Sequence, residues 1–167
     1  VIRITGVPEM RGGCYSIIPD QIEAGTFMLL AAAAGGEVLV RNIIPKHMDS
    51  LTSKLEEMGV NVTEYDDSIR IERSGSLKGI SVRTMPYPGF PTDLQPQMVA
   101  LLSTVKGNST VTEDVWENRF QYVDELRAMG ADIEISGKKA LIKGGTLHGS
   151  EVRATDLRAG AALIIAG

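Results

Sequence analysis

The segment Leu55-Glu56-Glu57-Met58-Gly59 is repeated 71 residues later as Leu126-Arg127-Ala128-Met129-Gly130. In each copy a leucine and a methionine lie three residues apart, on one face of a predicted helix, and the following glycine is typical of a helix C-terminus. The same offset aligns three more pairs: Gly36 with Gly107, Val62 with Ile133, and Ile71 with Ile142. Landmarks that share one offset indicate an internal duplication.

The residues around this segment predict the elements of each copy. The capping box of Asp20 and Glu23 opens a helix over 22–34, which the glycine pair 35–36 ends. The other elements predicted in the first copy are strands at 14–18, 37–40 and 80–84, a helix at 48–58, and a hairpin of strands 61–64 and 68–72. Each copy is therefore predicted to be a β-α-β-α-β-β unit of about 70 residues.

The fold class that follows is α+β, built from repeated units. Repeat one is predicted at about 14–84, repeat two at about 85–154, and the start of a third at 155–167. The helix predicted at 156–166 is apolar on nearly every face, which predicts burial all round. We therefore expect the helices to pack together inside, with the sheets outside.

The composition argues against nucleic acid and membranes as partners. The 167 residues are 43% hydrophobic, as in a globular domain, and 17 basic against 21 acidic side chains give a charge of −4. No block of like charges would bind nucleic acid, and the apolar stretch 27–34 is far below the roughly 20 residues needed to cross a bilayer. The sequence has one cysteine, Cys14, so it can form no intramolecular disulfide, which is typical of a reducing compartment such as the cytoplasm. We expect the thiol of Cys14 to be structural. We expect no metal and no cofactor.

The most irregular segment is 85–97, where three prolines and a glycine precede a helix. Ten residues separate Arg83 from Asp93, but only three separate Arg153 from Asp156, so the second copy contains a seven-residue insertion. Loops added to a rigid scaffold often have functional roles. The prolines are expected to hold Asp93 at a helix N-terminus, where free N–H groups stabilise a carboxylate. The plain alternative, that Asp93 only caps the helix, stays open.

Two more segments are candidates for binding. In 114–120, Glu117 and Arg119 lie between aromatic residues, where they could form an ion pair or bind an anion, and a backbone N–H could bind a ligand oxygen. The alternative is that these two side chains simply pair with each other. In 154–160, Asp156 and Arg158 begin an apolar helix, and charges there need a partner or a ligand.

Four motifs, in this order, resemble the UDP-N-acetylglucosamine 1-carboxyvinyltransferases, a family of enolpyruvyl transferases. They are Pro19-Asp20-Gln21-Ile22-Glu23-Ala24-Gly25-Thr26-Phe27, Pro91-Thr92-Asp93-Leu94-Gln95-Pro96-Gln97, Glu117-Asn118-Arg119-Phe120 and Ala154-Thr155-Asp156-Leu157-Arg158-Ala159. The resemblance covers essentially the whole chain. The related shikimate-pathway transferases share the fold, yet these motifs are closer to the UDP-sugar branch.

The resemblance implies a fold and an activity. The fold has two domains, each an inside-out α/β barrel of three β-α-β-α-β-β units, with the active site in the cleft between them. The activity moves the enolpyruvyl group of phosphoenolpyruvate to the 3-hydroxyl of UDP-N-acetylglucosamine and releases phosphate. This is the first committed step of peptidoglycan synthesis.

The same resemblance implies roles for five residues. Asp93 matches the aspartate that contacts the sugar hydroxyl and acts as its general base. Val115 matches a position whose backbone meets the UDP-sugar, while Arg119, Asp156 and Arg158 match charged residues of the cleft.

Other groups of the family have no counterpart in this chain. They are a lysine-asparagine pair, a mobile loop with a reactive cysteine, which Cys14 does not replace, and a later arginine. The chain opens without methionine and stops inside an apolar pattern, so we expect a fragment that is inactive alone and whose apolar end at 163–166 favours self-association. Two alternatives stay open: a non-catalytic repeat domain that binds a sugar nucleotide or a protein, and the shikimate-pathway transferase.

Overall fold

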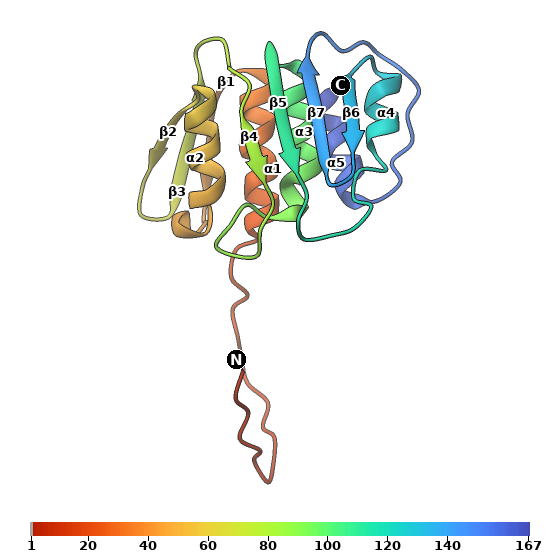
Figure 1. Cartoon of the computed structure of the whole chain (residues 1–167). Coiled ribbons are helices and arrows are strands. Elements are labelled where there is room, and N and C mark those ends of the chain that lie inside the picture. The colour runs from red at the N-terminus through yellow and green to blue at the C-terminus, as the bar shows by residue number, and fades with distance from the viewer. Residues whose placement is uncertain (1) are drawn as a thin grey trace.

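The computed structural model describes residues 2–167. Residues 2–20 form neither helix nor strand and project from the body of the molecule (Figure 1). The strand predicted at 14–18 is therefore wrong. Its alternating side chains are not buried, and Tyr15 and Ile17 are both exposed. A strand persists only where a neighbour satisfies its backbone groups, and this segment has no partner strand within residues 2–167.

The first group of elements follows the predicted order. It contains α1 (Gln21–Ala34), β1 (Gly36–Arg41), the 3₁₀ turn η1 (Pro45–His47), α2 (Asp49–Met58), β2 (Asn61–Glu64) and β3 (Ser68–Arg73). The carboxylate of Asp20 accepts the N–H groups of Ile22 and Glu23 and so caps α1. Gly59 ends α2 with a φ of 102°, a left-handed conformation that glycine adopts without strain. The predicted helices and hairpin of this group are confirmed.

The second group has the same succession of helix, strand, helix and two strands, with one more strand before it and one more helix after it. It contains β4 (Ser81–Arg83), the 3₁₀ turn η2 (Thr92–Leu94), α3 (Gln95–Thr104), β5 (Gly107–Thr112), α4 (Val123–Ala128), β6 (Asp132–Ser136), β7 (Lys139–Gly144) and α5 (Leu157–Ala166). Because β4 and β5 are parallel, the loops that leave them, 84–91 and 113–122, lie at the same end of the molecule, the lower end in Figure 1.

The strands form two sheets. The first has the order β1-β3-β2 and is antiparallel throughout. The second has the order β4-β5-β7-β6, in which β4 runs parallel to β5 and the other neighbours are antiparallel. The order β5-β7-β6 matches that of β1-β3-β2, and β4 covers the outer edge of β5. The equivalent edge of β1 has no partner strand within residues 2–167. The repeat boundaries themselves stay a prediction.

Three helices pack together against the sheets. The central helix, α3, contacts both α1 and α5; the sheet of β4, β5, β7 and β6 lies in front of this layer, and the sheet of β1, β2 and β3 lies beside α1 (Figure 1). Residues 98–102 of α3 are fully buried, and their side chains belong to one continuous apolar cluster that includes residues of both sheets. The expected packing of helix on helix is observed.

The expectation for α5 was too strong. Ala159, Ala162 and Leu163 face the core, but Leu157 and Ile164 are 78% and 73% exposed. Among the described residues α5 packs mainly against α3, with fewer contacts to α1 and α4. These neighbours cover only part of the helix, so its remaining apolar side chains meet solvent.

Candidate functional site

Asp93 is held by two arginines from distant parts of the chain. Its Oδ1 accepts a hydrogen bond from Arg119 Nη2 and its Oδ2 accepts one from Arg158 Nη2, each at 2.9 Å. Asp93 lies in η2, Arg119 in the loop after β5, and Arg158 in the first turn of α5. The three side chains are between 25% and 37% exposed, so the cluster is open to solvent and to a ligand. The structure thus brings three of the five predicted site residues into contact.

The carboxylate of Asp93 does not cap a helix, which sets it apart from two similar aspartates. Asp20 accepts N–H groups at the start of α1, and Asp156 accepts the N–H groups of Arg158 and Ala159 at 2.7 and 2.9 Å. The alternative that Asp93 only caps the helix is therefore wrong.

Local sequence explains the difference. Asp93 sits inside the 3₁₀ turn η2, one turn before α3, and Leu94 occupies the N-cap position of that helix. Pro96 has no N–H, and the N–H of Gln95 already bonds to the carbonyl of Thr92. Few free N–H groups remain for the carboxylate of Asp93, which bonds to Arg119 and Arg158 instead.

Asp156 stands at the edge of the cluster rather than in it. Its carboxylate is used in capping α5, and that cap fixes the backbone of Arg158. Arg158 then reaches Asp93 with its guanidinium group. Asp156 acts on the cluster through the first turn of α5.

The loop 113–118 has a different hydrogen-bond pattern from the expected one. The N–H groups of Val115 and Trp116 both donate to Oε1 of Glu113, at 2.9 and 3.0 Å. These two N–H groups are therefore not free for a ligand oxygen. No bond to the carbonyl oxygen of Val115 occurs within residues 2–167. Trp116 is exposed, and Arg119 pairs with Asp93 instead of Glu117.

A buried tyrosine lies under the cluster. Tyr122 donates its hydroxyl to Oε1 of Gln95 at 2.8 Å. Burial raises the pKa of the Tyr122 phenol well above its ordinary value of about 10, and the negative charges of Glu113 and Asp156 add to that rise, while Arg119 opposes it. The phenol is therefore neutral at physiological pH and acts as a hydrogen-bond donor.

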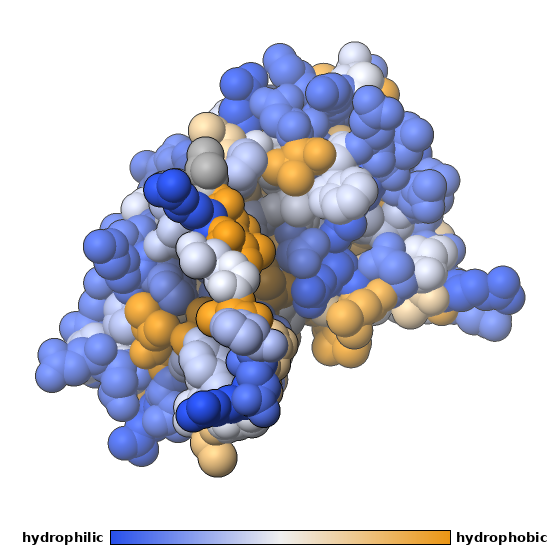
Figure 2. Space-filling view, turned by 90° about the horizontal axis from the view of Figure 1, so that it is seen from below, coloured by the Kyte–Doolittle hydropathy of each residue, from blue (hydrophilic) through white to orange (hydrophobic). Residues whose placement is uncertain are grey.

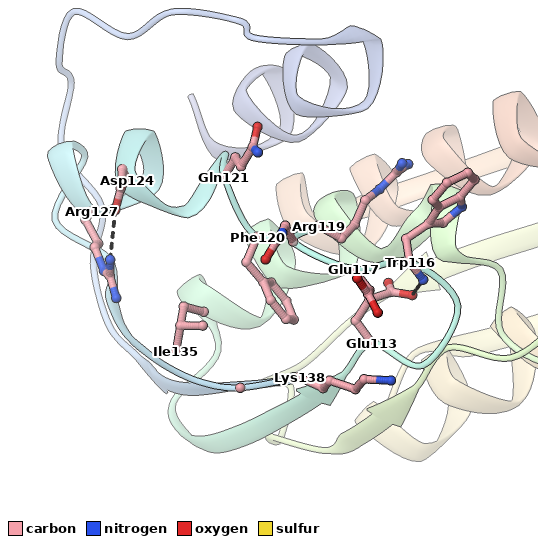
Figure 3. A pocket seen from close by; sticks show the side chains of 12 residues that line it. Glu113, Trp116, Glu117, Arg119, Phe120, Gln121, Asp124, Arg127, Ile135 and Lys138 are labelled. Carbon is pink, nitrogen blue, oxygen red and sulfur yellow. Dashed lines mark hydrogen bonds and ion pairs between the residues drawn. The ribbon is translucent and has the colours of Figure 1, made fainter.

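A cavity of about 550 Å³ lies beside the same loop. It is lined by the loop, by Asp124 and Arg127 of α4, and by the turn between β6 and β7. Phe120 points toward Ile135, whereas the side chain of Arg119 points away, toward the helices (Figure 3). Seen from this end, the surface is mostly hydrophilic and is hollowed beside the projecting N-terminal segment (Figure 2).

The sequence analysis missed Glu113, whose side chain is 1% exposed. The sequence contained one indication of its burial. Alternate residues of a strand face the same side, so Glu113 lies on the same buried side as Val111. The polar pair of Tyr122 and Gln95 was also missed, since nothing in the sequence connects these two positions.

Comparison with known proteins identifies the family. The sequence model of the EPSP synthase (3-phosphoshikimate 1-carboxyvinyltransferase) family matches residues 1–167. The UDP-N-acetylglucosamine 1-carboxyvinyltransferase of Desulfofundulus thermocisternus is 55% identical over 170 residues, which cover all of this chain and 70% of that protein. The chain belongs to the UDP-N-acetylglucosamine 1-carboxyvinyltransferase branch of this family. The relative from Clostridium botulinum is 56% identical, and the chain spans 40% of its length.

Solved structures agree with the assignment to an enolpyruvyl transferase fold. The enolpyruvyl transferase NikO from Streptomyces tendae has a TM-score of 0.81 and 27% identity, over 90% of this chain and 36% of that chain. EPSP synthase from Acinetobacter baumannii has a TM-score of 0.70 over 93% of this chain and 38% of its own, and at 19% identity it shows the fold alone. The chain is therefore a mixed α/β part of this transferase fold.

No three His, Cys, Asp or Glu side chains of 2–167 come together in a way that could hold a metal ion. None of the helices in that range is long and apolar enough to cross a membrane.

Proposed function

We propose that this chain forms one side of the active site of an enolpyruvyl transferase that uses phosphoenolpyruvate and UDP-N-acetylglucosamine. The observation that supports it is the carboxylate of Asp93 held between Arg119 and Arg158 in a solvent-open cluster. The reaction belongs to peptidoglycan synthesis, and the single cysteine favours a reducing compartment such as the cytoplasm.

Asp93 is suited to receive a sugar hydroxyl. A carboxylate has about four lone-pair sites, and the two arginines occupy two of them, so each oxygen can accept one more hydrogen bond. In the proposed reaction the 3-hydroxyl oxygen bonds to C2 of phosphoenolpyruvate, its proton passes to Asp93, and C3 takes up a proton. Loss of a proton from C3 and departure of inorganic phosphate then restore the double bond. Asp93 orients the hydroxyl and accepts its proton.

The charges around Asp93 favour anionic substrates. The two positive charges of Arg119 and Arg158 exceed the single negative charge of Asp93. In addition, Arg119 Nε is buried without a hydrogen-bond partner in the part of the chain that the structure describes. The carbonyl oxygen of Val115 can accept a donor of the sugar nucleotide. A phosphate dianion or trianion needs more cations than these two, and we propose that the rest of a longer protein supplies them.

The test measures phosphate release by the full-length protein that contains this sequence. We expect release from phosphoenolpyruvate when UDP-N-acetylglucosamine is added, and none when shikimate 3-phosphate is added instead. The 167-residue chain alone is expected to release no phosphate above background. Asp93→Ala should lower turnover by about 100-fold or more, because a positioned base contributes that much. The Kd for the sugar nucleotide, followed by Trp116 fluorescence, should rise by a smaller factor than the factor by which turnover falls.

Glu57→Ala is the matched control, since Glu57 is an exposed carboxylate of α2 that pairs with Lys54 and lines neither the cluster nor the cavity. It should leave both quantities unchanged. Near-normal turnover in Asp93→Ala would contradict the role of Asp93. Release with shikimate 3-phosphate would assign the other branch, and tight sugar-nucleotide binding without any release would favour a non-catalytic binding domain.

A further inference from the structure

Glu113 is a buried carboxylate with four hydrogen bonds. It follows β5 directly and is 1% exposed. Its Oε1 accepts the hydroxyl of Thr84 at 2.7 Å and the N–H groups of Val115 and Trp116, and its Oε2 accepts the hydroxyl of Thr92 at 2.9 Å. One side chain therefore joins three segments: the end of β4, the turn η2 and the loop after β5.

Two of these segments contain the proposed substrate contacts. Thr92 is the neighbour of Asp93, and the N–H of Val115 is fixed so that its carbonyl is left for a ligand. Thr84 completes the link, because its hydroxyl oxygen also accepts the N–H of Asp114 at 3.0 Å. Glu113 thus sets the distance between the Asp93 turn and the Val115 loop.

The charge of Glu113 is hard to explain by stability. All four donors are neutral, and Glu113 forms no salt bridge within the described part of the chain. Burying a charge without an opposite charge is costly, so a site selected only for stability would favour an apolar or amide side chain. A carboxylate has a geometric advantage, because two oxygens can accept from three segments at once.

We propose that Glu113 is a positioning residue of the transferase site, which holds the turn with Asp93 in register with the loop of Val115. This inference rests on the function proposed above. A positioning role differs from a purely structural role in one respect: a Glu113→Ala protein that still folds should lose catalytic efficiency and not only stability.

The kinetic test uses the full-length protein with Glu113→Ala, Glu113→Gln and Thr92→Val. Glutamine can accept the two N–H groups and the Thr84 hydroxyl through its oxygen and can donate to Thr92, so Glu113→Gln should keep kcat/KM within about tenfold. Glu113→Ala should lower kcat/KM by about 100-fold, the effect of a misplacement near 1 Å. Thr92→Val cuts only the link to the Asp93 turn, and it should lower kcat with little change in KM for the sugar nucleotide.

Thr104→Val is the control, because Thr104 bonds only to the carbonyl of Leu101 in its own helix. It should match the parent in both kcat and KM. Parent kinetics in folded Glu113→Ala would overturn the inference. Equal losses in Glu113→Gln and Glu113→Ala would also overturn it, because charge and not geometry would then matter.

A second measurement does not depend on catalysis. Hydrogen exchange of the Val115 and Trp116 amides in the 167-residue chain should be slow in the parent and in Glu113→Gln. In Glu113→Ala it should be at least about tenfold faster, while the amide of Thr110, bonded to the carbonyl of Ile80, stays protected. Unchanged exchange in Glu113→Ala would overturn the positioning role. If the full-length protein transfers no enolpyruvyl group but these amides respond, the proposed function fails and the geometric link stands.

Discussion

The ion pairs of Asp93 contribute little to folding. Partly exposed pairs are worth up to about 1 kcal/mol, and salt screens them further. The caps formed by Asp20 and Asp156 are worth about 1 kcal/mol each and are not screened in the same way. Because the Asp93 cluster brings together three distant segments for so small a gain in stability, its arrangement is better explained by ligand binding.

Tyr122 gives a prediction about pH. Its folded-state pKa is raised, so its stabilising effect is complete below the unfolded pKa of about 10 and is lost as the pH rises toward the folded value. The free energy of unfolding should therefore fall above about pH 10, and Tyr122→Phe should flatten that fall. At neutral pH the same variant should be less stable by about 1–3 kcal/mol, because Gln95 Oε1 loses its donor. Urea unfolding across this pH range measures both effects.

Tyr15→Phe is the control for this measurement, since Tyr15 is exposed in the N-terminal segment. It should leave the stability and its pH dependence as in the parent. If Tyr122→Phe and the parent gave parallel curves above pH 10, the buried phenol would not be the source of the fall.

At the scale of elements, the sequence predicts those helices, turns and strands that neighbouring residues determine. The hairpin of β2 and β3 was predicted from alternation and a turn of Asp66 and Asp67, and the end of α2 from Gly59, because both signals lie within a few residues. Contacts between distant segments could not be found in this way. The alternating residues 14–18 favour an extended strand, but the pattern does not show whether another strand pairs with them. In the same way, the apolar residues of α5 do not show which elements cover them.

The same distinction applies to the site. Asp93, Arg119 and Arg158 were singled out from their motifs, but their mutual contacts depend on the packing of α5 against α3. The alternative of a capping aspartate at 93 rested on its place before a helix, but Asp93 lies inside the turn η2, and Leu94 is the N-cap of α3. Glu113 escaped notice because its partners come from 84, 92 and 115, which only the folded sheet brings together.

Gly144, the last residue of β7, gives a prediction about the contact between sheet and helix. A Cβ at this position would overlap the carbonyl oxygen of Val105 at the end of α3. Gly144→Ala should therefore lower the free energy of unfolding by about 3 kcal/mol, the upper range for overpacking. The next residue, Gly145, has open space around it, so Gly145→Ala should change stability by less than about 0.5 kcal/mol. Equal urea midpoints for the two variants would contradict this close approach.

At the scale of the whole molecule, the site depends on contacts between elements that lie far apart in the chain. Asp93, Arg119 and Arg158 all belong to the second group of elements, but Arg158 comes from α5, where the sequence predicts the start of a third repeat. These helices meet in a single apolar cluster that also includes α1 of the first group. A disturbance in the first group should therefore reach the site through the helix layer.

Leu29 tests this coupling, because it is fully buried in α1 and far along the chain from Trp116. Leu29→Ala should lower the free energy of unfolding by about 2–5 kcal/mol through the cavity it leaves. If the chain unfolds as one unit, the midpoints from circular dichroism and from Trp116 fluorescence should coincide and shift together. Ile164→Ala is the control, since this apolar side chain is exposed and its loss should cost less than about 0.5 kcal/mol. A fluorescence midpoint that stayed at the parent value while circular dichroism shifted would show that the two groups unfold separately, and the helix layer would then not couple them.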